Sequence, residues 1–216
     1  MNKVYTGLLA VCLLFTACDK DDYKYPNAKT DLAELIVSGQ NHGLRFTTDD
    51  GICWEAVNQV NTKELKTDSI YRFIVMYEPQ TLQASNGTAK IFDLEWAISP
   101  CPIPEQEVKG PLKTDPVSLQ SIWQSDRYLN MVLEMKAKDQ EHKLFFVDQG
   151  ITTAADGTRT LHILLYHDRA NDVEGFTKKF CLSVPLWLYE QQLSKGDNIT
   201  FKLQTKQGML TKTFPY

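Results

Sequence analysis

Apolar and polar residues alternate with a period of two over most of the chain, and this alternation constrains the fold more than any other feature. Between 128 and 135, for example, apolar residues occupy every second position: Leu129, Met131, Leu133 and Met135. Successive side chains of a β-strand point to opposite faces, so the pattern predicts strands with one buried face and one wet face. The sequence therefore predicts an all-β protein.

The predicted strands form two groups, in which turn-forming pairs such as Asp-Gly separate neighbouring strands. The first group covers 32–37, 44–48, 52–57, 69–77 and 90–98, and the second covers 128–135, 143–148, 161–168, 176–184, 199–204 and 209–214. In the last strand of the first group we expect one buried face, made of Phe92, Leu94, Trp96 and Ile98. A short helix is expected over 186–193, after a proline. The spacing of the second group suits a β-sandwich.

Residues 99–116 separate the two groups and contain five prolines but few large apolar groups. This composition is typical of a domain boundary. We therefore expect a first β domain over 32–99, a Pro-rich linker over 100–116 and a second β domain over 117–216.

The N-terminus resembles the signal of an exported lipoprotein. Lys3 precedes an uncharged apolar stretch from Val4 to Phe15, which as a helix reaches roughly 20 Å and is too short to span a membrane core of about 30 Å. Residues 14–18, Leu-Phe-Thr-Ala-Cys, resemble a lipobox. We expect 1–17 to be a signal peptide and Cys18 to carry the lipid; an ordinary secretory signal with an incidental cysteine is the alternative.

Residues 18–31 are polar and without a hydrophobic period, so they predict a lipidated, solvated tether. Its run Lys20, Asp21 and Asp22 resembles the export signal that sends lipoproteins of the Bacteroidota to the outer face of the outer membrane. A merely solvated charge run is the other interpretation. The expected location is the outer membrane, with the domains facing the cell exterior.

Motifs for catalysis or metal binding are missing from the sequence. His162 and His167 lie five apart on a predicted strand, so they point to opposite faces and cannot hold one metal, and His142 has no second ligand at close spacing. There is no Gly-rich phosphate loop, nucleophile elbow or His-Glu-x-x-His helix. We therefore expect no catalytic residues, no metal and no organic cofactor.

Two covalent modifications are predicted besides the lipid. Cys53 and Cys101 are the expected disulfide pair and close a loop of about 50 residues; three free thiols, with Cys181, are the alternative. Ser69 is a predicted O-glycosylation site, because Asp-Ser-Ile resembles the acceptor motif of Bacteroides envelope proteins.

A set of short motifs occurs in a particular order along the chain. The lipobox and acidic tether are followed by Asp49–Gly51, Tyr71–Val75, the Pro-rich junction, Asp115–Val117, Ser121–Trp123 and Tyr128–Asn130. This order resembles the NigD-like lipoproteins of Bacteroides and Prevotella. The resemblance implies an N-terminal OB-like β-barrel followed by a C-terminal β-sandwich, and a family name inherited from a bacteriocin-associated operon. It implies no established activity and no catalytic residue.

Three classes of function remain: a surface-exposed binding or accessory module, a structural or protective partner of envelope proteins, and an unrecognised hydrolase. We favour binding, because OB-like barrels and sandwiches commonly present ligand sites. The ligand would be extracellular or another envelope protein; a net charge of −4 with scattered lysines argues against nucleic acid. Trp123, Tyr128 and Trp187 are candidates for stacking on a ligand, although aromatic side chains of β domains are more often core.

Overall fold

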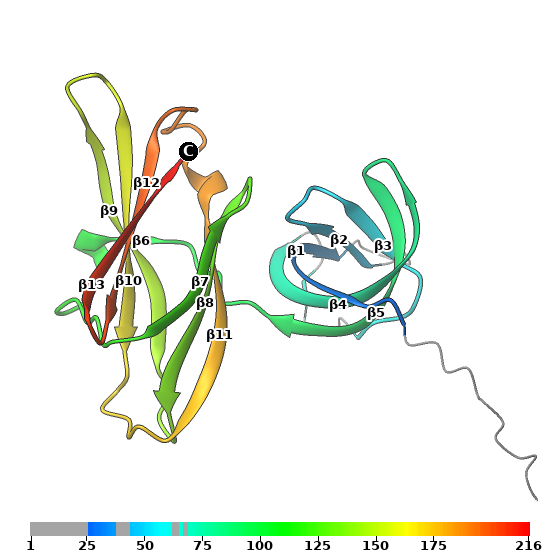
Figure 1. Ribbon diagram of the computed structural model, residues 1–216, viewed down its shortest axis with the longest axis horizontal. Helices are drawn as coiled ribbons and strands as arrows, with labels where there is room; N and C mark the ends of the chain where they lie inside the picture. The colour runs from blue at the N-terminus through cyan, green and yellow to red at the C-terminus, as the bar shows by residue number, and fades with distance from the viewer. Residues whose placement is uncertain (1–25, 38–43, 62–64, 67–68) are drawn as a thin grey trace, which may run out of the picture.

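The computed structural model describes residues 26–37, 44–61, 65–66 and 69–216. The described chain forms two β domains that lie side by side, a closed barrel followed by a two-sheet sandwich (Figure 1). The expected all-β fold, with an OB-like barrel before a β-sandwich, is confirmed. The predicted signal peptide, Cys18 and most of the tether lie outside the described residues.

The barrel consists of five strands in the order β1-β2-β3-β5-β4, and pairing of β1 with β4 closes it. The strands are β1 (Lys29–Val37), β2 (Leu44–Thr48), β3 (Cys53–Ala56), β4 (Ile70–Gln83) and β5 (Asn86–Trp96). Strands β3 and β5 pair in parallel, and the other pairs are antiparallel. Phe46, Trp54 and Tyr77 fill the interior and contact one another through their rings. Aromatic burial of this kind stabilises a barrel too small for an extended core.

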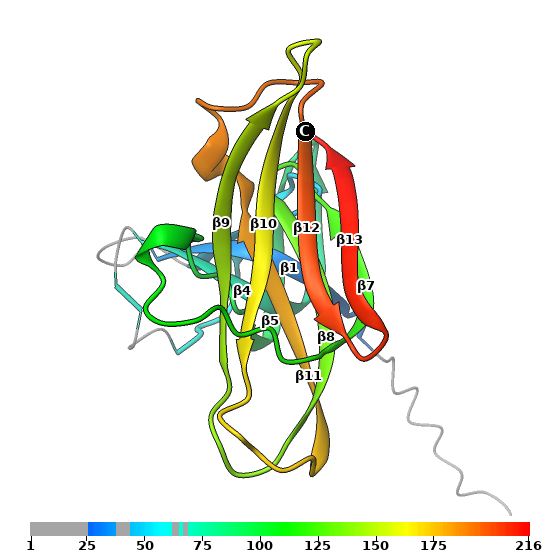
Figure 2. The same ribbon diagram turned by 90° about the vertical axis from the view of Figure 1, so that its left-hand side faces the viewer.

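The sandwich packs a five-stranded sheet, β13-β12-β10-β9-β6, against a three-stranded sheet, β11-β8-β7 (Figure 2). Its elements are β6 (Ile103–Pro104), η1 (Glu105–Glu107), β7 (Ser118–Gln124), β8 (Tyr128–Ala137), β9 (Lys143–Thr153), β10 (Arg159–Asp168), β11 (Phe176–Pro185), η2 (Leu186–Tyr189), β12 (Asn198–Thr205) and β13 (Gly208–Pro215). The alternating residues of β8 all point into the core, as the sequence predicts. The expected helix over 186–193 is one 3-10 turn, η2. No helix among the described residues is long and apolar enough to cross a membrane.

The expectation for the buried face of β5 is confirmed at Leu94, which packs against the barrel core, and is wrong at Phe92. Phe92 is 39% exposed and Trp96 is 54% exposed, whereas Ala89 and Ile91 point into the barrel. The pairing of β4 with β5 shifts register at this point, and Phe92 has no partner in the ladder. Such a bulge exchanges the inward and outward sides of a strand, which periodicity alone does not reveal.

The domain limits also differ from those expected. β1 begins at Lys29, so the last three residues of the predicted tether pair with β4; main-chain pairing needs no apolar side chain. The predicted linker over 100–116 lies against the sandwich, where β6 pairs with β9 and Thr114 bridges to His167. Proline is excluded from central strands but tolerated at sheet edges. The Pro-rich composition therefore marks an edge segment of the second domain.

The chain passes between the domains without a flexible joint. Directly after β5, Ile98 bridges to Leu182 of β11, with hydrogen bonds to the main chain of Cys181 and Ser183 of 2.9 and 3.0 Å. One residue earlier, the N–H of Ala97 donates to the carbonyl of Arg72 in β4. The connection is thus tied to both domains by its backbone.

Candidate functional site

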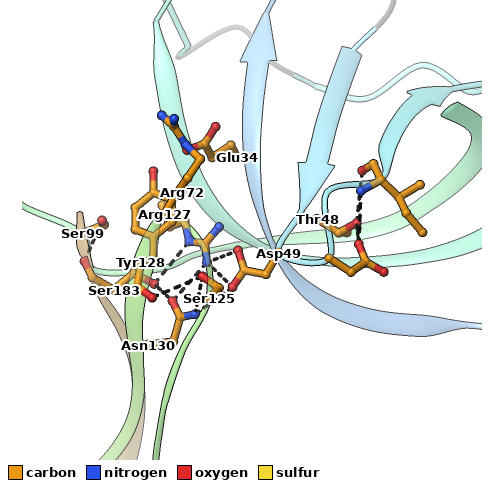
Figure 3. Close-up of polar contacts among 12 residues, drawn as sticks. Glu34, Thr48, Asp49, Arg72, Ser99, Ser125, Arg127, Tyr128, Asn130 and Ser183 are labelled. Carbon is orange, nitrogen blue, oxygen red and sulfur yellow. Dashed lines mark hydrogen bonds and ion pairs between the residues drawn. The ribbon is translucent and has the colours of Figure 1, made fainter. Parts of the chain in front are cut away.

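A buried arginine links the two domains. Arg72 lies on β4 of the barrel with 5% of its surface exposed. Its Nη2 is 2.6 Å from Oδ1 of Asp49, in the turn after β2, and donates to Oδ1 of Asn130 on β8 at 3.1 Å. Its Nε donates to Oγ of Ser183 on β11 at 3.3 Å. The guanidinium therefore contacts both domains, as the sticks of Figure 3 show.

Asn130 and Ser183 complete this network from the sandwich side. The Asn130 amide donates to Oδ2 of Asp49 at 2.7 Å, and the Ser183 hydroxyl donates to Oδ1 of Asn130 at 2.7 Å. Both sandwich residues are fully buried. Additional hydrogen bonds offset the desolvation of a buried ion pair, and here they join the two domains in one orientation.

A second polar contact across the interface lies beside the first. Nε of Arg127, between β7 and β8, donates to Oε1 of Glu34 on β1 at 2.8 Å. The next residue, Tyr128, packs its ring 4.0 Å beneath the guanidinium of Arg72. Burial, and then the negative charge of Glu34, raise the pKa of Tyr128 to about 12. The Tyr128 hydroxyl is therefore uncharged at ordinary pH, and its ring packs within the interface.

Beside this interface is an open groove of about 680 Å³, which we call the interdomain groove. Its aromatic lining comes from both domains: Tyr71 and Trp96 from the barrel, Tyr128 and Trp187 from the sandwich. The ring of Trp96 is held by Phe73 at 4.2 Å and by Tyr71 at 5.6 Å. Ligand pockets of about 300–1,000 Å³ typically combine such apolar walls with a few polar groups.

The charged group that lines the interdomain groove is the same guanidinium. Arg72 is one of the lining residues, and its Nη1 is buried with no hydrogen-bond partner among the described residues. An unpaired buried donor costs free energy until an acceptor reaches it. The groove therefore combines aromatic walls with a guanidinium whose buried Nη1 lacks an acceptor.

The residues singled out in the sequence separate in space. Tyr128 and Trp187 line the interdomain groove, and so does the half-buried Ser69, whereas Trp123 lies at a different cleft. Cys53, Cys101 and Cys181 are free thiols, so the structure does not contain the expected disulfide. Cys53 lies on β3 of the barrel, while Cys101 follows the domain crossing. Closeness in sequence is no guide to the Cα distance that a bridge requires.

Sequence reasoning missed two groups of residues that converge in the structure. The first group is Asp49, Arg72 and Asn130, which belong to three of the short motifs that carried the family resemblance, yet nothing in their spacing predicts that they meet. His142 and His167 do meet, with ring nitrogens 3.0 Å apart, although they are distant in sequence. No group of three or more metal-binding side chains occurs within the part of the chain that the structure describes.

A closed five-stranded barrel joined to an eight-stranded sandwich through a buried Arg-Asp-Asn cluster defines a two-domain all-β protein. The model of the NigD-like C-terminal β-sandwich domain matches residues 99–216, more than half of the chain. The protein therefore belongs to the NigD-like family.

Solved structures resemble both domains together. A NigD-like immunity protein from Bacteroides caccae has a TM-score of 0.69 at 26% identity, covering 90% of this chain and 99% of that one. A toxin-related protein from Parabacteroides distasonis and a protein of unknown function from Bacteroides vulgatus both have a TM-score of 0.68, at 16% and 18% identity. They cover 88% of this chain and 93% and 90% of their own, and at these identities they show the fold alone. Among curated proteins, none matches the sequence.

Proposed function

We propose that this protein is a lipid-anchored, non-enzymatic recognition protein of the bacterial cell envelope, and that it binds its ligand in the interdomain groove. The observation that carries the proposal is the meeting of aromatic walls from both domains beside the unpaired Nη1 of Arg72. The lipobox at Cys18 and the acidic run after it support an address on the outer membrane, facing the exterior.

The chemistry of the groove defines the class of ligand. Arginine offers donors only, so the group that pairs with Nη1 has to be an acceptor such as a ligand oxygen. Nη1 itself is buried, so a ligand oxygen reaches it only after the side chains that cover it shift. Asp49 already neutralises the charge of Arg72, which favours a neutral acceptor over a phosphate. Trp96 and Trp187 offer flat apolar surfaces. A neutral pyranose, with its carbon-hydrogen face on an aromatic ring and an oxygen at Nη1, satisfies all three conditions.

Rigidity of the walls supports the same proposal. The Arg72 network and the backbone bridge at Ile98 hold the two sides of the groove in one relative position. A ligand therefore does not have to order the domains as it binds, and preorganisation of this kind increases affinity.

Calorimetric titration with a panel of neutral oligosaccharides, and with peptides of matched size as a second arm, tests the proposal. We expect Trp96→Ala to weaken oligosaccharide binding at least about tenfold, as for an aromatic anchor. Phe92→Ala is the matched control, because Phe92 is an exposed aromatic residue on the same strand that does not line the groove. Equal affinity of the two variants would place recognition elsewhere.

A protective function is the second candidate, because the relative from Bacteroides caccae with 26% identity is described as an immunity protein. In that case the groove would receive a peptide segment of a toxin. A sensitive strain that produces this protein would then survive a bacteriocin that kills its parent, and the peptide arm of the titration would show the binding.

A further inference from the structure

A second buried polar cluster lies in the sandwich, away from the Arg72 network. His142 lies in the loop between β8 and β9, and 5% of its side chain is exposed. His167 lies near the end of β10, and 2% of its surface is exposed. Nδ1 of His142 is 3.0 Å from Nε2 of His167. The outer nitrogens face acceptors: Nε2 of His142 is 3.3 Å from Oδ2 of Asp172, and Nδ1 of His167 is 2.8 Å from the carbonyl oxygen of Asp115.

Both ends of this chain of hydrogen bonds are acceptors. A carbonyl oxygen has no proton to donate. Asp172 is ionised, because hydrogen bonds from the backbone N–H groups, that of Lys138 first and those of Asp139 and Val173 with it, lower the pKa of its carboxyl group well below the usual range. The two outer nitrogens of the histidines must therefore both carry hydrogen.

The proton count follows from these contacts. Two outer N–H groups and one N–H between the rings make three, whereas two neutral imidazoles carry only two. With all three contacts formed, the pair thus holds one extra proton. The contact of 3.3 Å between Nε2 of His142 and the Asp172 carboxylate places the extra proton on His142, which then donates from both nitrogens while His167 accepts at Nε2. The pKa of His167, which burial lowers, agrees with this assignment.

We propose that His142 and His167 form a buried binding site for one proton, and that this proton locks the loop 138–142 onto the loop 169–175. Asp172 holds both loops, because it accepts from the main chain of Lys138 and Asp139 as well as from His142. Removal of the proton necessarily breaks one of the three contacts, since two N–H groups cannot make three hydrogen bonds.

Three ion pairs already join charged groups that lie around the histidine pair. Lys113 bonds Asp168 at 2.7 Å, Lys206 lies 3.6 Å from Glu174 and Arg169 lies 3.9 Å from Asp115. On β8, Glu134 accepts from Gln120 and Lys136 lines the same cavity of about 480 Å³. Asp172 is therefore the acid that neutralises the proton on the histidine pair.

A site that keeps one proton makes the free energy of unfolding depend on pH in a distinctive way. Unfolded, the two histidines have ordinary pKa values of about 6.5 and together hold two protons in acid, one near pH 6.5 and none in alkali. Below about pH 6.5 the unfolded state binds more protons than the folded state, so stability rises with pH; above it the folded state binds more, so stability falls. Each limb changes the unfolding constant by up to about tenfold per pH unit.

Urea unfolding of the purified protein between pH 5 and 8 tests the proposal. We expect a maximum of stability near pH 6.5 for the wild type, and loss of the falling limb above pH 6.5 in His142→Gln, in which the hydrogen bond between the two rings can no longer hold an extra proton. His162→Gln is the matched control on the same strand as His167 and should keep both limbs, because His162 bonds Thr152 and does not contact the histidine pair. A wild type without the falling limb, or a variant that retains it, would overturn the proposal.

Imidazole nitrogen NMR of the wild type keeps the proposal testable if His142→Gln does not fold. At pH 7 the spectrum should contain three protonated nitrogens on His142 and His167 together, with His142 protonated at both. Two neutral rings at pH 7 would show that no extra proton is bound.

Discussion

Arg72 of the barrel and Asn130 of the sandwich share a hydrogen bond of 3.1 Å across the domain interface. Both side chains also bond the same carboxylate, that of Asp49. Each domain thus contributes part of one closed network, and the groove beside it depends on the resulting orientation.

Asn130→Ala should destabilise the protein by about 3 kcal/mol, because it removes partners of two charged groups and of a buried hydroxyl at once. Urea unfolding followed by tryptophan fluorescence measures the loss. Gln120→Ala is the control, since its exposed hydrogen bond to Glu134 should contribute less than about 0.5 kcal/mol. Equal losses in the two variants would show that the interface network contributes no more than a surface bond.

Gly87→Ala should destabilise the barrel by about 2–3 kcal/mol through overpacking. A Cβ at Gly87 would lie 2.5 Å from the carbonyl oxygen of Thr81 and 2.5 Å from Cζ3 of the buried Trp54. For comparison, Gly157→Ala meets no atom within 4 Å and is strained only by its φ of +88°, which costs about 1–2 kcal/mol. Thermal unfolding of the two variants should rank them in that order, and the reverse order would contradict the packing.

Thiol alkylation of the unreduced protein should modify Cys53, Cys101 and Cys181, because all three are free. Cys101, which is exposed, should react first. Burial raises the pKa of Cys181, so less of it is the reactive thiolate and its alkylation should be several-fold slower. Mass spectrometry at successive times measures both the number and the order. A species in which, of these three, only Cys181 can be alkylated would instead show that Cys53 and Cys101 form a disulfide.

Cys18→Ala should release the protein from the membrane fraction, because stable anchoring depends on acyl chains at that position. Metabolic labelling with a fatty acid should mark the wild type and not the variant. Protease added to intact cells should digest the wild-type protein if it faces the exterior. Resistance in intact cells, with digestion after lysis, would place it in the periplasm.

Ser69 should carry an O-glycan in the native host, detected as an added mass on the peptide that contains it. Because Ser69 lines the interdomain groove, a glycan there would occupy part of it. Ser69→Ala should then increase the affinity of the groove for an added oligosaccharide. An unmodified peptide from the native host would refute the modification.

The strands, and the face to which each of their side chains points, could be predicted from the sequence wherever a strand keeps one register. In β8 the positions 129, 131, 133 and 135 face the sandwich core as their alternation predicts, because a two-residue period and a regular ladder give the same side at every step. The order of short motifs likewise predicted the family. Where the ladder shifts, the same reasoning put Phe92 on the wrong face.

The sequence by itself determined the all-β character, the two-domain order and the family, since these depend on local periodicity and motif order along one dimension. Only the tertiary structure decided that Asp49, Arg72 and Asn130 share one network, that the Pro-rich segment borders the sandwich, and that His142 lies against His167. These contacts join residues far apart in the chain, and their energies depend on distances and burial that become defined only when strands from separate regions pack together.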